Sequence, residues 1–158
     1  LAVCHFLVDA AHYGFTVRTV EAPYFRRVTA QRRNGTPPPD DALYQRLSGE
    51  LAARLGPPRA TSRAQTASTR DGKGIVFVAH DGQVYPAGFL PMPLASVREA
   101  PLATIYQENE YLVALRHGGF TGRCGPCEVS DLCGGSRARA WAATGNLLAE
   151  DPSCPFPA

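Results

Sequence analysis

The sequence has 158 residues, of which 44% are hydrophobic and 19% are charged. This length fits one ordinary domain, or a small domain with part of another, and the composition is that of a globular chain with a core. A net charge of +2 is too small to indicate a nucleic-acid-binding protein, and no apolar run reaches the roughly 18 residues of a membrane span. We therefore expect neither nucleic acid nor a membrane among the partners.

Residues 1–33 predict a helix, a strand and a second helix. Apolar residues recur at helical spacing over residues 1–11, and Gly14 ends the run. The β-branched stretch 16–20 predicts a strand, and Pro23 then opens a short basic helix. A helix followed by a strand is typical of an α/β layer.

The first helix carries three side chains that bind metals in many proteins, Cys4, His5 and His12. The two histidines are seven residues apart and so lie on one side of the helix. The sequence offers them no further ligand. We expect a small core residue at Cys4 and surface histidines at the other two positions, with a metal site as the alternative.

Residues 34–72 are predicted to form a linker with one helix. A proline-rich stretch follows an Asn-Gly turn, and leucines at four-residue spacing then predict an amphipathic helix over residues 42–55. The segment after this helix has almost no large apolar residue. We expect its positive side chains to be solvated, the alternative being contact with an anionic partner; they are Arg54, Arg59, Arg63, Arg70 and Lys73.

Residues 73–158 begin with a β-hairpin, because two β-branched and aromatic runs flank an Asp81-Gly82 turn. A helix is predicted over residues 101–117, ended by a pair of glycines. The cysteine-rich loop comes next, and a short helix over residues 136–144 follows it, ended by Gly145. The fold class expected for the chain is α+β.

Four of the five cysteines have the spacing C-x2-C-x5-C-x20-C, at Cys124, Cys127, Cys133 and Cys154. A secreted disulfide framework would spread an even number of cysteines through the chain, so the pattern favours a metal site in the reducing cytoplasm. Two residues between the first thiols let both face one ion, and the neighbouring glycines permit the backbone turns. The spacing leaves two metals open, because four thiolates bind structural zinc and iron–sulfur clusters alike.

The stretch "GRCGPCEVSDLCGGSRARAWAATGNLLAEDPSCPF" resembles the C-terminal auxiliary-cluster region, called SPASM or twitch, of radical SAM proteins. It is most similar to the subgroup related to haem-modifying and haem-biosynthesis enzymes, as are "TVEAPYFRRV" and "DGKGIVFVAHDGQVYPAGFLP". The resemblance implies that residues 1–33 are the last helix and strand of a partial β/α barrel. It implies an auxiliary-cluster domain over residues 73–158, with a small hairpin and helices around the four-cysteine loop.

The family pattern also implies how many clusters this region holds. A full SPASM domain binds two [4Fe–4S] clusters, and the second needs cysteines where this sequence has Ala87 and Ser136. The resemblance therefore implies one auxiliary [4Fe–4S] cluster, bound by Cys124, Cys127, Cys133 and Cys154. Such a closed site favours electron transfer, or a structural role, over binding of substrate to iron. In protein purified in air, oxygen strips such clusters and zinc can take the empty thiolates.

The loop that cleaves S-adenosylmethionine in radical SAM enzymes, C-x3-C-x2-C, has no match in this sequence. The resemblance therefore implies that the chain alone does not cleave this cofactor and is no enzyme by itself. The first residue is leucine, and we expect a piece of a longer radical SAM oxidoreductase. The expected main partner is the rest of the radical SAM core, with its own cluster and S-adenosylmethionine.

The end of the first strand is where α/β layers place ligand-binding groups. Four side chains there are candidates for binding a peptide or tetrapyrrole substrate, the alternative being a solvated basic helix face; they are Glu21, Tyr24, Arg26 and Arg27.

Arg137 and Arg139 begin the helix behind the cysteine loop. Beside a thiolate-bound cluster they would offset its charge and raise its reduction potential. Contact with another domain is the alternative. We expect the auxiliary domain to exchange electrons with a redox protein during turnover and to close the substrate site.

Two other classes of function remain open. The first is a non-enzymatic zinc module whose four cysteines serve structure or protein interaction. The second is nucleic-acid binding by a zinc-knuckle-like loop, which the lack of interleaved aromatic and basic residues disfavours.

Overall fold

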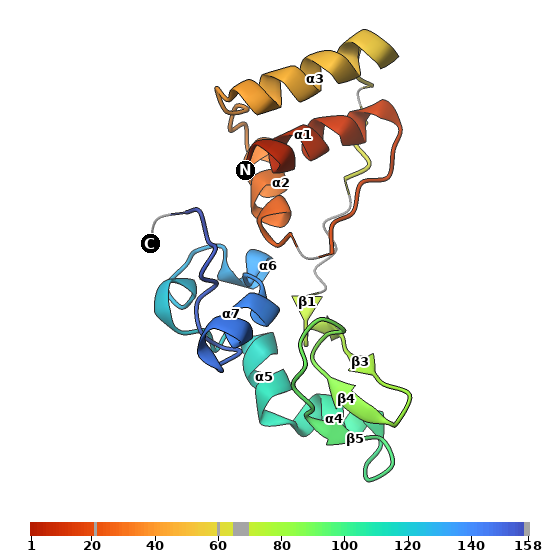
Figure 1. The fold of residues 1–158 in the computed structure, drawn as a ribbon, viewed down its shortest axis with the longest axis vertical. Coiled ribbons are helices and arrows are strands. Elements are labelled where there is room, and N and C mark those ends of the chain that lie inside the picture. The colour runs from red at the N-terminus through yellow and green to blue at the C-terminus, as the bar shows by residue number, and fades with distance from the viewer. Residues whose placement is uncertain (21, 60, 65–69, 157–158) are drawn as a thin grey trace. The chain divides into compact units, whose positions relative to one another are not determined.

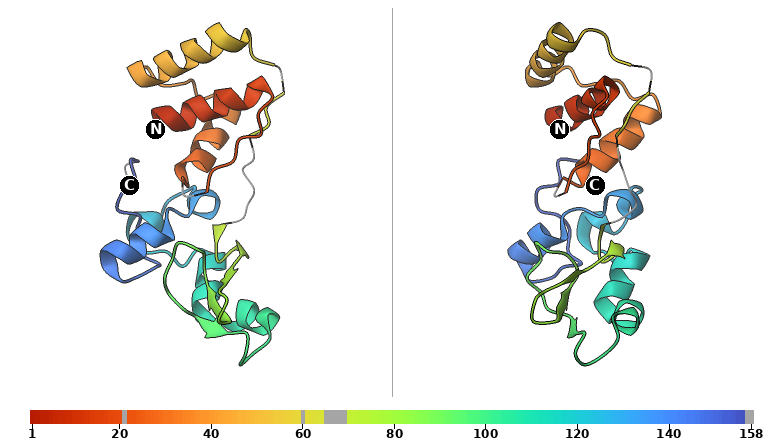
Figure 2. Two further views of the ribbon diagram at one scale, coloured as in Figure 1. Left: turned by 45° about the vertical axis from the view of Figure 1, so that its right-hand side comes forward. Right: turned by 90° about the vertical axis from the view of Figure 1, so that its right-hand side faces the viewer.

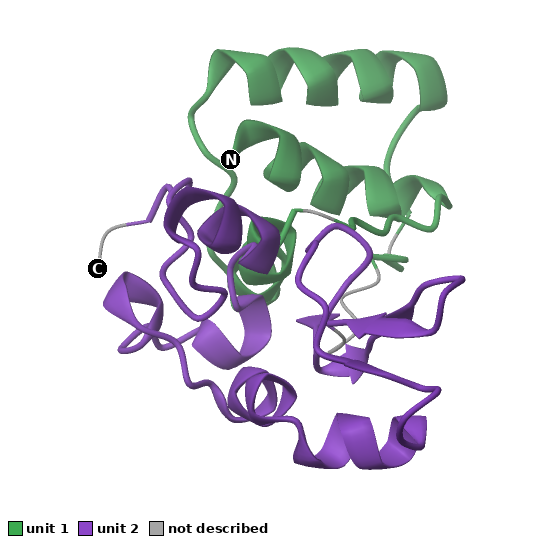
Figure 3. Cartoon of the chain, turned by 60° about the horizontal axis from the view of Figure 1, so that its bottom comes forward, with its two compact units in different colours: residues 1–67 green, residues 68–158 purple. Residues whose placement is uncertain are grey.

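The computed structural model describes the chain except residues 21, 60, 65–69 and 157–158. It divides into two compact units, Leu1–Ala67 and Ser68–Ala158, which Figure 3 shows in separate colours. The described part of the first unit is built from helices, and that of the second combines helices with two small sheets. The boundary between the units falls inside the segment predicted to be a linker.

The first unit packs two helices against a third. Helix α1 contacts both α2 and α3 and lies beside α3 in the views of Figures 1 and 2. The helices are α1 (Ala2–Ala10, continued by a 3₁₀ turn over Ala11–Tyr13), α2 (Tyr24–Arg33) and α3 (Ala42–Leu55). The buried apolar side chains come from the first two helices and the turn: Val8, Ala10, Ala11, Phe25 and Val28.

Local signals set most helix ends in this unit. Gly14 follows the first helix with φ 93°, a conformation that side chains with a Cβ rarely adopt, so its predicted stop is confirmed. Asp41 caps α3 by accepting hydrogen bonds from two backbone N–H groups. The prediction of a strand over residues 16–20 is wrong for the part that the structure describes. Only a single bridge between Val17 and Ala64 forms there, and β-branched residues make a strand only when a partner extends the pairing.

Asp9 on α1 links the three helices through its carboxylate. It accepts a hydrogen bond of 2.6 Å from the guanidinium of Arg32 on α2 and one of 2.5 Å from the hydroxyl of Tyr44 on α3. His5, one turn earlier on α1, packs edge-on against the same tyrosine. The expectation of a surface histidine at this position is wrong, because His5 is 8% exposed, and its burial lowers the pKa of the imidazole.

The second unit contains a two-stranded parallel ladder and a three-stranded antiparallel sheet (Figure 1). The predicted hairpin is confirmed, with Val78 opposite Val84 across the turn that contains Asp81-Gly82. The third strand was not predicted and completes the antiparallel sheet. The strands are β1 (Arg70–Asp71), β2 (Gly74–Ile75), β3 (Phe77–Val78), β4 (Gln83–Tyr85) and β5 (Ala95–Ser96).

Two helices replace the one predicted over residues 101–117: α4 (Leu102–Glu108) and α5 (Glu110–His117). Asn109 leaves the helical conformation with ψ 124°, and its side chain accepts hydrogen bonds from the N–H groups of Tyr111 and Leu112. An asparagine that caps the next turn competes with helix continuation, which apolar periodicity does not reveal. The predicted stop at Gly118 is confirmed, with φ 76°.

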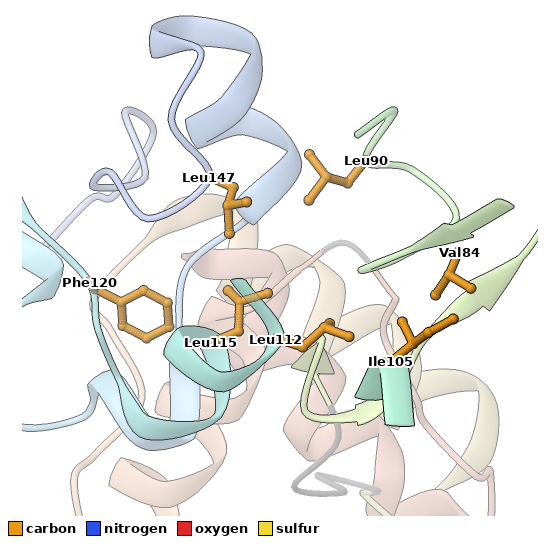
Figure 4. Packing of buried hydrophobic residues seen from close by; sticks show 7 residues of the cluster. All are labelled: Val84, Leu90, Ile105, Leu112, Leu115, Phe120 and Leu147. Carbon is orange, nitrogen blue, oxygen red and sulfur yellow. The ribbon is translucent and has the colours of Figure 1, made fainter. Parts of the chain in front are cut away.

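The core of the second unit brings together side chains from β4, α4 and α5 (Figure 4). Phe120 joins the same cluster from the segment before the first three candidate cysteines, and Leu147 joins it from the segment after α7 (Arg137–Thr144). The core therefore anchors residues on both sides of the loop that contains Cys124, Cys127 and Cys133. Its fully buried or nearly buried members are Val84, Leu90, Ile105, Leu112, Leu115, Phe120 and Leu147.

Candidate metal centre

The four candidate ligands lie in three short segments of the second unit. Cys124 ends a 3₁₀ turn over Gly122–Cys124, and Cys133 ends helix α6 (Ser130–Cys133). Cys127 lies between these elements, and Cys154 lies in the C-terminal tail. Cys133 is buried and the other three are half-buried, and the structure joins none of the described cysteines in a disulfide.

Glycines let the cysteine loop turn in two tight places. Gly134 and Gly135 follow Cys133 with φ values of 67° and 60°, in the left-handed region that favours glycine. A Cβ on Gly135 would lie 2.8 Å from the Cβ of Asp151, so this turn also needs the missing side chain. Between the first two cysteines, a Cβ on Gly125 would lie 2.8 Å from the backbone oxygen of Phe120.

Backbone hydrogen bonds join the cysteine loop to the tail that carries Cys154. The N–H of Thr121 donates to the carbonyl of Leu148 at 2.8 Å. Two residues further along each segment, the N–H of Arg123 donates to the carboxylate of Glu150 at 2.7 Å. These two bonds place residues 148–150 of the tail beside the first cysteine without the help of a metal ion.

Asp151 ties the tail to helix α7 (Arg137–Thr144) from a fully buried position. Its carboxylate accepts hydrogen bonds from the N–H of Ser136 at 2.7 Å and from two nitrogens of Arg139 at 2.7 and 3.0 Å. Ser136 in turn caps α7 by accepting a hydrogen bond from the N–H of Arg139. Ser136 therefore has a structural role in this fold, as the cap of α7 and a partner of Asp151.

Arg137 is buried beside Cys124. The guanidinium is 2% exposed and donates to the carbonyls of Leu147 and Ala149 at 2.9 and 2.6 Å. A third contact, of 3.8 Å, runs from one of its nitrogens to the sulfur of Cys124. Burial lowers the pKa of Arg137, and the nearby Cys124 sulfur opposes that shift.

Arg70 holds the turn that contains Cys133. It is 6% exposed and donates to the carbonyls of Ser130 at 2.8 Å, Asp131 and Leu115 at 3.1 Å. The expectation that this arginine is solvated in a linker is wrong, because its long-range partners lie in α5 and α6. The aromatic ring of Phe120 lies within cation–π distance of both arginines, 5.3 Å from Arg70 and 4.6 Å from Arg137.

Cys124 and Cys154 both lie near the guanidinium of Arg123. The pKa of Arg123 is raised chiefly by its hydrogen bond to Glu150 and, more weakly, by the charges of these two cysteines. The same contact lowers the pKa of Glu150. The first and last thiols of the motif therefore lie within electrostatic reach of one cation, although 30 positions separate them.

Among the residues that the structure describes, no three or more His, Cys, Asp or Glu side chains are arranged to hold a metal ion. The four-cysteine site therefore stays a prediction. The chemistry of the donors fits a thiolate-bound metal or cluster, because four thiols occur in one unit and a buried cation contacts one of them. A buried nitrogen of that cation, Nε of Arg137, has no hydrogen-bond partner among the described residues.

The other predicted site residues lie in the first unit. Tyr24, Arg26 and Arg27 are half-buried in the first turns of α2, and each interacts with another group, while Glu21 falls outside the described residues. No observation on these side chains tests the predicted substrate contact, which stays a prediction.

Sequence reasoning missed Arg70 and Asp151 as residues of the cysteine region. Arg70 stood in a polar segment, and its partners lie 45 to 61 positions away along the chain. Asp151 had a usable signal in the sequence, since it directly precedes the Pro-Ser-Cys of the last ligand. An acidic residue at that place has a basic helix, residues 137–139, as its natural partner.

No model of a known protein family matches the sequence. Curated relatives do match. An AdoMet-dependent heme synthase of Nitratidesulfovibrio vulgaris is 34% identical over 137 residues, which are 84% of this chain and 36% of the relative. The AdoMet-dependent heme synthase of Methanosarcina barkeri is 41% identical over 92 residues, 58% of this chain and 26% of the relative. A pre-heme d1 synthase of Dinoroseobacter shibae is 32% identical over 88 residues, 52% of this chain and 22% of the relative.

The alignments therefore span about a third of the curated relatives, or less. Within the described residues, no helix is both long and apolar enough to cross a membrane. These matches confirm the resemblance to enzymes of haem biosynthesis, whereas the auxiliary-cluster region stays a prediction. The chain is homologous to radical SAM enzymes of haem biosynthesis.

Proposed function

We propose that the second unit binds one [4Fe–4S] cluster through Cys124, Cys127, Cys133 and Cys154, as the auxiliary-cluster region of a radical SAM haem-biosynthesis enzyme. The observation that carries the proposal is the buried guanidinium of Arg137 at 3.8 Å from the Cys124 sulfur. A buried cation beside a thiol favours the thiolate, which is the form that binds iron and zinc.

The chain's own residues have three tasks in this proposal. Arg70 and the two glycines after Cys133 shape the α6 turn, and Asp151 fixes the tail so that Cys154 returns to the loop. The core around Phe120 keeps bulk water from the Cys124 side of the loop. When bound, the cluster would supply one-electron transfer, accepting or donating an electron during turnover of the whole enzyme.

The names of the relatives favour a tetrapyrrole as the substrate of the whole enzyme. In this proposal residues 1–33 form the end of the partial barrel that faces that substrate. The cationic side chains of Arg26 and Arg27 at the start of α2 would then bind its carboxylates.

The cluster is tested on the full chain, purified without oxygen and reconstituted with iron and sulfide. We expect brown protein with about four iron and about four sulfide ions per chain. Replacing any of the four cysteines by alanine should lower the iron content, whereas Cys4→Ala is the matched control and should retain it.

A colourless protein that binds one zinc ion and takes up no iron under these conditions would contradict the proposal. It would favour the structural zinc module, the second reading of the same four thiols. Retention of full iron content in the Cys154→Ala variant would instead show that the tail is not part of the site.

A further inference from the structure

Four arginines surround the cysteine region, and they differ in what neutralises them. Arg139 pairs with Asp151 at 2.7 Å, Arg123 with Glu150 at 3.1 Å, and Arg70 reaches Asp131 at 3.5 Å. Arg137 forms no ion pair with any carboxylate of the described chain. Its contacts are two carbonyl oxygens, the face of an aromatic ring and the sulfur of Cys124.

An unpaired cation in this position has a high cost. Arg137 is 2% exposed, and a buried charge without a directly bonded carboxylate loses its hydration, which the more distant charges of Asp151 and Asp71 offset only in part. Arg137 is also the first residue of α7, where the positive end of the helix dipole repels a cation. Both effects disfavour arginine here unless an anion lies close to it.

The nearest candidate anion is the group bound by the cysteines. Four thiolates carry four negative charges, of which the iron–sulfide core offsets part, and a cluster that accepts an electron becomes more negative by one charge. One nitrogen of Arg137 contacts the Cys124 sulfur, and its Nε has no hydrogen-bond partner among the described residues. Its charge therefore lies next to the first candidate ligand.

Resting on the function proposed above, we propose that Arg137 is the positioning residue that sets the reduction potential of the four-cysteine centre. A nearby positive charge stabilises the reduced, more negative form, so it raises the potential. The charge of Arg139 is already balanced by a fully buried carboxylate, and its side chain is 34% exposed. The sequence alone gave both arginines the same role.

The test compares three variants of the reconstituted chain by redox titration of the cluster against mediator dyes. Arg137→Gln keeps hydrogen-bond donors without the charge and should shift the potential to more negative values. Arg137→Lys keeps the charge and should stay closer to the parent. Arg98→Gln, at an exposed arginine of the same unit away from the cysteines, is the control and should leave the potential unchanged.

The proposal is overturned if Arg137→Gln retains both its cluster and the parent potential, or if Arg98→Gln shifts the potential as far. Loss of the cluster from Arg137→Gln, with circular dichroism showing that the apo-protein still folds, supports it, because the charge is then needed to hold the anionic centre. An apo-protein that no longer folds makes Arg137 a purely structural residue and overturns it.

The parent chain separates this proposal from the one on which it rests. If the parent chain takes up no iron, both proposals are contradicted, because there is no cluster whose reduction potential Arg137 could set. A parent with the cluster and variants without a shift removes only the role of Arg137.

Discussion

At the scale of single residues, the cysteine region depends on buried ionic groups as much as on its thiols. Asp151 is the acidic member of this set, with its carboxylate fully buried and bonded to α7 and to its own tail. A buried carboxylate is stable only while its partners remain, since otherwise its lost hydration is not replaced. Asp151 therefore fixes the approach of Cys154 without being a candidate ligand.

We expect Asp151→Asn to lower the free energy of unfolding of the second unit by roughly 2–4 kcal/mol, because charge-assisted hydrogen bonds to Ser136 and Arg139 are lost from a buried site. Urea denaturation of the apo-chain measures this. Asp131→Asn is the control: its carboxylate is 79% exposed, and the change should cost less than about 1 kcal/mol. Equal losses in the two variants would show that burial of Asp151 carries no special weight.

At the scale of elements, short helices and turns around the cysteines end where glycine permits a left-handed backbone. Gly135 and Gly145 have φ values of 60° and 69°, so both are suited to glycine by conformation. They differ in their surroundings. A Cβ on Gly145 would meet nothing within 4 Å, whereas one on Gly135 would lie 2.8 Å from a Cβ of the tail.

Gly145→Ala should therefore cost about 1 kcal/mol, the conformational penalty alone. Gly135→Ala should cost roughly 1–3 kcal/mol more, because it also overpacks the turn against Asp151. Thermal unfolding of the two apo-variants gives the comparison. A smaller loss at Gly135 than at Gly145 would mean that the tail moves away from the loop at little cost.

The sequence predicted the elements whose causes are local. Gly14, Asp81-Gly82 and Gly145 act through their own backbone conformation or turn, and their predicted effects are confirmed. The predictions failed where a competing local hydrogen bond or a distant partner determines the backbone conformation. The side chain of Asn109 interrupts an apolar periodicity that runs on through it, and β5 pairs with β4 across residues 86–94, a connection too long for a tight hairpin turn to set the pairing.

The same distinction between local and distant causes applies to the candidate site. The spacing of the cysteines is visible in the sequence, and so are the glycines that let the loop turn. The burial of Arg70 was not visible, because its three carbonyl partners come from segments far along the chain. The difference between Arg137 and Arg139 depends on Asp151, which approaches only one of them in an ion pair.

At the scale of the whole molecule, two compact units divide the chain, and the candidate metal ligands fall in one of them. The alignment with the N. vulgaris heme synthase covers 84% of the chain, which is more than either unit contains. The homology therefore includes residues of both units. A metal bound in the second unit stabilises directly the unit that binds it.

We expect removal of the cluster by a chelator to speed amide hydrogen exchange in residues 68–158 and to leave the amides of α1–α3 nearly unchanged. The physical reason is that binding free energy adds to the stability of the unit that holds the site. Exchange measured by mass spectrometry on the cluster-loaded and stripped chain resolves the two units. Equal acceleration in both would show that they unfold together.

The ring of Phe120 lies near two guanidinium groups, those of Arg70 and Arg137, which come from different segments. This arrangement affects how a cluster is assembled. Through Arg70 and Arg137, this one ring is connected to the backbone of α5, α6 and the tail by five carbonyl hydrogen bonds. These contacts act as non-covalent cross-links in a stretch where little regular structure pairs the backbone. These contacts restrict the backbone around Cys124 and Cys133 before a metal binds, so less of its conformational entropy remains to be lost on metal insertion.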